Sequence, residues 1–129
     1  MILETSFILD YLKGEKSAAL KMHHIVDENE EVGIATPTIF ELWTGLSAFQ
    51  QRNDEKERIN NIIKDQILYP LDKESAEIAG KINGELIKKG LQIDPEDCMI
   101  AGIAITNNKK LLTRDVHFNR IEGLKVESY

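Results

Sequence analysis

Four carboxylates stand where strands are predicted to end or helices to begin: Glu4, Glu41, Asp97 and Asp115. Carboxylates gathered in one cleft repel each other, and some take up protons unless a cation neutralises them. An all-oxygen ligand set favours a hard ion, Mg²⁺ or Mn²⁺, over zinc. Such an ion lowers the pKa of water and holds a phosphodiester for in-line attack. The four acids therefore predict a metal site for phosphodiester hydrolysis, provided that the fold brings them together.

Each acid also has a purely structural interpretation. Glu41 stands three residues after a threonine, which is the spacing of a helix capping box. Asp97 is placed to interact with the positive end of a helix dipole, and Asp115 to cap a short helical turn. Glu4 stands between apolar residues, so it is predicted to be partly buried and to need a partner.

Short apolar runs alternate with longer helical patterns, which predicts a parallel sheet with helices on both faces. Strands are predicted at 1–3, 32–35, 67–69, 110–112 and 124–126. Helices are predicted at 5–12, 16–29, 39–49, 54–64, 73–89 and 96–106, with a helical turn at 118–121. In such α/β sheets ligands bind at the carboxyl ends of the strands. Glu4 and Asp115 stand at two of these ends.

The length of 129 residues fits one domain, residues 1–129, with 42% hydrophobic residues to build a core. The net charge of −6 argues against a protein that coats nucleic acid through bulk positive charge. This net charge does not exclude binding of nucleic acid by a local group of basic residues. Four basic residues stand close together in the sequence: Lys109, Lys110, Arg114 and Arg120.

No apolar run reaches the length of a membrane span, and residues 1–12 lack the pattern of a secretory signal. The single cysteine, Cys98, excludes an intramolecular disulfide framework and suits a reducing compartment. These features predict a cytoplasmic protein that does not bind a membrane.

The histidines and the cysteine are weaker candidates. His23 and His24 are adjacent on a predicted helix and diverge by about 100°, so they cannot hold one ion together. His117 lies close to Asp115, but a loop histidine is its default interpretation. Cys98 begins a buried helix and is predicted to be a packing thiol.

The four acids lie in four stretches, at residues 1–10, 36–42, 93–104 and 111–126. These stretches read MILETSFILD, TPTIFEL, IDPEDCMIAGIA and LLTRDVHFNRIEGLKV. In this order they resemble the motifs of PIN-domain nucleases, and among these the VapC-type toxins of prokaryotic toxin–antitoxin pairs.

The resemblance implies an α/β/α sandwich on a parallel sheet, a homodimer, and endoribonuclease activity that depends on Mg²⁺ or Mn²⁺. It also implies a small antitoxin that wraps the toxin and blocks its site. By the resemblance Glu4, Glu41, Asp97 and Asp115 are catalytic and bind metal, while Thr5 or Thr113 orients a carboxylate or phosphate. We add Lys109, Lys110, Arg114 and Arg120, from charge and position, as contacts to the RNA backbone.

One residue departs from the family pattern, in which the first acid is usually Asp and is here Glu4. The extra methylene moves the carboxylate by about 1.5 Å, and misplacement on the order of 1 Å can cost about 100-fold in rate. The sequence is therefore compatible with an enzyme adapted to glutamate, a weakened or engineered enzyme, or a silent module that acts mainly by binding its antitoxin.

A phosphoacceptor receiver domain is a third interpretation, because it shares the length and the α/β pattern. Such a domain needs a phosphorylatable aspartate directly after a mid-chain strand. Residues 51–70 offer only Asp54 and Asp65, which stand at the two ends of a predicted helix and not directly after a strand, and this disfavours the class.

Overall fold

A computed structural model describes residues 1–49 and 53–129. Within these residues, five parallel strands form one sheet in the order β3-β2-β1-β4-β5. The strands are β1 (Ile2–Leu3), β2 (Gly33–Ala35), β3 (Ile67–Tyr69), β4 (Leu111–Leu112) and β5 (Val126–Glu127). The predicted parallel α/β sheet is confirmed. Because β1 lies at its centre, residues that follow β1 reach the middle of the carboxyl edge.

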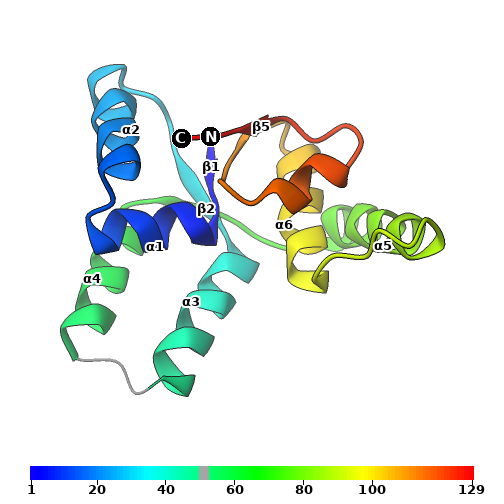
Figure 1. Cartoon of the computed structure of the whole chain (residues 1–129), viewed down its shortest axis with the longest axis horizontal. Helices are drawn as coiled ribbons and strands as arrows, with labels where there is room; N and C mark the ends of the chain where they lie inside the picture. The colour runs from blue at the N-terminus through cyan, green and yellow to red at the C-terminus, as the bar shows by residue number, and fades with distance from the viewer. Residues whose placement is uncertain (50–52) are drawn as a thin grey trace.

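Helices connect the strands. They are α1 (Thr5–Lys13), α2 (Lys16–Asp27), α3 (Thr36–Ala48), α4 (Asn53–Ile63), α5 (Lys73–Lys88) and α6 (Pro95–Thr106), with the 3₁₀ helix η1 (Val116–Arg120). Figure 1 shows α1, α2 and α4 to one side of the strands and α5 to the other, with α6 beside it. The predicted three-layer arrangement is confirmed.

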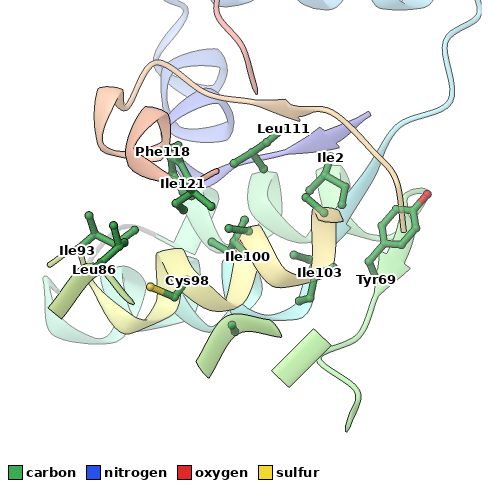
Figure 2. Packing of buried hydrophobic residues seen from close by; sticks show 14 residues of the cluster. Ile2, Tyr69, Leu86, Ile93, Cys98, Ile100, Ile103, Leu111, Phe118 and Ile121 are labelled. Atoms are coloured by element: carbon green, nitrogen blue, oxygen red, sulfur yellow. The ribbon is translucent and has the colours of Figure 1, made fainter. Parts of the chain in front are cut away.

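Side chains alternate across the strands and so build two separate cores. Ile2 and Leu111 face the core beneath α5 and α6, which also holds Ile100. Figure 2 shows these residues gathered around α6. The next residue of each strand, Leu3 or Leu112, faces the second core, beneath α1 to α4. Both faces of the sheet are thus covered, which is what continuous apolar strands require.

Several boundaries differ from the prediction by one to three residues, and two of these differences have a clear physical cause. The helix predicted at 39–49 begins at Thr36, since Pro37 fits the first turn of a helix, where its missing N–H costs no hydrogen bond. The last strand, predicted at 124–126, is Val126–Glu127. The pairing explains this shift, because the amides of Leu111 and Thr113 bond to carbonyl oxygens of residues 125 and 127.

In the described part of the chain, no helix combines the length and the apolar character needed to cross a membrane.

Candidate metal centre

Three of the four predicted acids meet at the carboxyl edge of the sheet. Glu4 directly follows β1, Glu41 lies on α3, and Asp97 lies in the first turn of α6. One carboxylate oxygen from each lies within 4.8 Å of the other two. The fold thus brings together residues 4, 41 and 97, as the strand-end rule predicts.

Glu4 is held in place by its own helix. Its side chain caps α1, and the residue is only 4% exposed. Oε2 accepts hydrogen bonds from the amide of Ser6 (3.0 Å), the Ser6 hydroxyl and the Thr113 hydroxyl (2.7 Å). Within the described residues no hydrogen bond reaches Oε1 of Glu4. One oxygen is therefore fixed, and the other is left for a cation.

Glu41 faces the same point from α3. Its Oε1 accepts a hydrogen bond of 2.9 Å from the Thr5 hydroxyl. Burial, reinforced by the nearby charge of Glu4, raises the pKa of Glu41 to about 7. The capping-box interpretation is wrong, since α3 begins at Thr36 and Thr38 lies within the helix rather than at its cap. Within the described residues the buried Thr38 hydroxyl has no hydrogen-bond partner.

Asp97 completes the group from α6 and is 8% exposed. Burial, reinforced by the charges of Glu41 and Glu4, raises its pKa to about 7. Buried acids that also repel one another are hard to ionise unless a cation neutralises their charge. An all-carboxylate donor set of this kind suits Mg²⁺ or Mn²⁺.

The fourth acid, Asp115, lies beside this group rather than within it. Its Oδ1 accepts a hydrogen bond from the His117 amide (2.9 Å) and lies 3.1 Å from Nδ1 of the same histidine. Asp115 therefore caps η1, as its structural interpretation predicts. It also lines a cleft of about 510 Å³ with Asp97 and Asp94, and its charge helps to raise the pKa of Asp97.

The predicted basic residues Lys109 and Lys110 do not lie near the candidate metal centre. Lys109 and Lys110 precede β4 and so lie at the amino edge of the sheet, about 10 Å from the residues that follow this strand. They pair with Glu31 and Glu127, each at 2.8 Å.

The other two predicted RNA contacts lie nearer the carboxyl edge and also have partners within the chain. Arg114 pairs with Asp10 at 2.8 Å. Arg120 donates to the carbonyl oxygens of Leu91 and Gln92.

Two features of the site were not predicted. Ser6, which the sequence did not single out for the site, donates its hydroxyl hydrogen to Glu4, the cap of α1. A cavity of about 410 Å³ also opens beside Thr5 and Glu41, between α1, α3 and α4. Its walls are mainly apolar, and they include the basic residues Lys13 and Arg58. No local sequence pattern indicates such a cavity, because three helices contribute to it.

Comparison with known proteins agrees with this arrangement. Residues 1–124 match the family described as the PIN domain, and the chain belongs to that family. It is 31% identical to Ribonuclease VapC1 of Methanocaldococcus jannaschii, over 98% of this chain and 85% of that protein. This family assignment overturns the receiver-domain alternative.

Solved structures share the fold. The VapBC2 complex of Rickettsia felis, bound to a DNA fragment from its promoter, includes a chain that superimposes with a TM-score of 0.88 at 23% identity, covering 99% of this chain and 97% of that one. VapBC-5 of Mycobacterium tuberculosis, from the VapBC family of toxin–antitoxin systems, gives a TM-score of 0.69 at 22% identity, with 98% and 94% covered.

Proposed function

We propose that the chain is a metal-dependent endoribonuclease and the toxin of a toxin–antitoxin pair. The observation that carries this proposal is the convergence of Glu4, Glu41 and Asp97, whose ligand oxygens lie within 4.8 Å of one another. The relative named Ribonuclease VapC1 supports RNA as the substrate. The same relative and the VapBC complexes support the role of toxin.

In this proposal each polar residue of the site has a separate task. Glu4, Glu41 and Asp97 hold Mg²⁺ or Mn²⁺, and Asp115 adds negative charge from the adjoining cleft. When bound, such an ion lowers the pKa of water and stabilises charge on the scissile phosphate. Thr113 and Ser6 keep Glu4 in its orientation, and Thr5 does the same for Glu41. Fixing the ligands in advance spares the reaction the cost of ordering them.

The test is cleavage of a labelled RNA by the Asp97→Asn variant. With Mg²⁺ or Mn²⁺ we expect activity to fall at least about 100-fold, since a positioned ligand of the ion is lost. Asp54→Asn is the matched control, because Asp54 lies in the first turn of α4 and is exposed. Equal cleavage by the unmodified chain in excess chelator would sink the proposal.

The same proposal includes a cognate antitoxin and a homodimer. The VapBC complexes support the first partner. Two apolar side chains on α3 are exposed, Phe40 to 59% and Trp43 to 38%, as expected for a surface that a protein partner covers. Light scattering should give twice the chain mass of 14.7 kDa for the dimer. The cognate antitoxin should abolish RNA cleavage at equimolar concentration.

A further inference from the structure

Asp10, a buried acid outside the metal centre, contacts the loop at residues 113–115. This loop supplies Thr113 and Asp115 to the metal centre. Asp10 lies on α1 and is 3% exposed. Its Oδ2 lies 2.8 Å from Nη1 of Arg114 and accepts a hydrogen bond of 2.9 Å from the Tyr129 hydroxyl. Asp10 thus joins α1 to two segments that are more than 100 residues away in the sequence.

Arg114 stands between Thr113 and Asp115, so its position affects both neighbours. Its backbone N–H faces the Ser6 hydroxyl at 3.4 Å. The Thr113 hydroxyl donates to Glu4 and accepts a hydrogen bond of 3.0 Å from the Asp115 amide. The ion pair with Asp10 thus holds the Arg114 side chain. Ser6 holds the Arg114 backbone, and Glu4 holds the Thr113 hydroxyl.

Tyr129 closes the far side of the ion pair. Its ring packs edge-on against Phe7, with 4.8 Å between the ring centroids. Burial, followed by the hydrogen bond to Asp10, raises the pKa of Tyr129 to about 12, so the phenol stays protonated and donates to Asp10. A buried carboxylate needs such partners, because an unpaired buried charge is costly.

We propose that Asp10 is a positioning residue: through Arg114 it holds residues 113–115 against α1, where Thr113 orients Glu4. This inference rests on the proposed nuclease function. It also gives Arg114 a task that differs from gripping RNA, since its guanidinium is engaged by an acid of its own chain. The Arg114 side chain is 60% exposed, and an ion pair with an exposed partner contributes little to stability. We therefore assign this ion pair to positioning the loop.

The experiment compares Asp10→Asn, Arg114→Ala and the double variant. For each we measure kcat and KM with labelled RNA and Mn²⁺, and Mn²⁺ affinity by calorimetry. We expect each single variant to lower kcat about 10-fold with KM nearly unchanged, because misplacement well below 1 Å already costs activity. Mn²⁺ affinity should fall several-fold in both. The double variant should be no worse than the worse single variant, since both changes remove one interaction.

Two control variants separate positioning from stability. Tyr129→Phe removes a hydrogen bond to Asp10 but keeps the ring and the ion pair, so kcat should stay near that of the unmodified chain even if Tm falls. Arg114→Lys keeps a charge and should recover part of the lost kcat. If kcat instead follows Tm in every variant, Tyr129→Phe included, Asp10 is only a structural residue and the inference is wrong.

A role for Arg114 in RNA binding gives a different pattern. Arg114→Ala would then raise KM and weaken the salt dependence of binding, while Asp10→Asn would behave like the unmodified chain. That result overturns the inference. If the unmodified chain binds Mn²⁺ but does not cleave RNA, the proposed function fails and the affinities still decide about Asp10. Equal Mn²⁺ affinities in all variants, or no binding by any of them, contradict the positioning role.

Discussion

At the scale of single residues, the glutamate at position 4 is accommodated by the structure around it. The longer side chain curls back as the cap of α1, where Oε2 receives bonds from Ser6 and Thr113. These bonds leave its carboxylate within 4.8 Å of Glu41 and Asp97. This geometry supports an enzyme adapted to glutamate over a silent binding module.

Shortening this residue tests that interpretation. In Glu4→Asp the carboxylate cannot keep the bond to Thr113 and its distance to Asp97 together, so we expect kcat for RNA cleavage to fall about 10-fold or more. The measurement is steady-state cleavage with Mn²⁺, with calorimetric Mn²⁺ affinity as a check on the site. A large gain in kcat would show that glutamate disables the centre, in favour of the silent module.

The pKa values of Glu41 and Asp97 give a second prediction at this scale. Both lie at about 7, above their ordinary values of 4.5 and 3.8, so the metal-free folded chain binds protons more tightly than the unfolded chain. Their contribution to stability is therefore favourable at low pH and is lost as the pH rises through about 7.

Asp97→Asn removes part of this penalty. In chelator the Tm of the variant, relative to that of the unmodified chain, should rise from pH 5 to about pH 7 and change little above that pH. Mn²⁺ at pH 8 should raise the Tm of the unmodified chain and have little effect on the variant. A Tm difference that does not change with pH, measured by circular dichroism, would contradict the shared repulsion among these acids.

At the scale of elements, the contact between α5 and α6 sets the position of Asp97. Gly102 of α6 lies against α5, so an added Cβ would stand 2.5 Å from the carbonyl oxygen of Ser75 and 3.0 Å from the amide of Ala79. Only glycine allows this close approach of two backbones. Any outward movement of α6 would also move the first turn, which carries Asp97.

Gly102→Ala should therefore destabilise the fold by about 1–3 kcal/mol, the usual cost of overpacking. The matched control is Gly80→Ala on α5, where an added Cβ meets open space. This control should stabilise the chain by about 1 kcal/mol, because alanine favours a helix interior. Urea unfolding measures both changes, and equal stability of the two variants would refute the close packing.

The elements and the acids were accessible from the sequence for different reasons. Apolar runs and helical spacing indicated the strands and helices, since both faces of the sheet had to be covered. Strand ends and family motifs then indicated Glu4, Glu41 and Asp97. The bond between Tyr129 and Asp10 was not predictable, because it joins residues 119 apart that only the complete sheet brings together.

The predicted basic cluster shows the converse case, because residues that were expected to lie together are separated in the structure. Lys110 and Arg114 are close in the sequence, yet β4 lies between them and carries its two ends to opposite edges of the sheet. The apolar run at 110–112 had predicted that strand, so the sequence already separated these two basic residues, although their spacing suggested a cluster.

At the scale of the whole molecule, the net charge of −6 is divided between functions. Several acids form ion pairs with the basic residues at the amino edge, as Glu31 does with Lys109. The carboxyl edge instead concentrates Glu4, Glu41 and Asp97, and the nearby cavity presents Lys13 and Arg58. In the proposed function a divalent ion would neutralise much of the charge at this edge, so that an acidic protein could accept an RNA phosphate there.

The most direct measurement is anomalous diffraction from crystals of the chain grown or soaked with Mn²⁺. The proposal predicts one strong anomalous peak from a Mn²⁺ ion that is coordinated by Glu4 Oε1 and by carboxylate oxygens of Glu41 and Asp97, at distances of about 2.1 Å. In crystals of Asp97→Asn the same peak should be absent or much weaker. A Mn²⁺ peak elsewhere, or an empty carboxylate group in a chain that still cleaves RNA, would contradict the account.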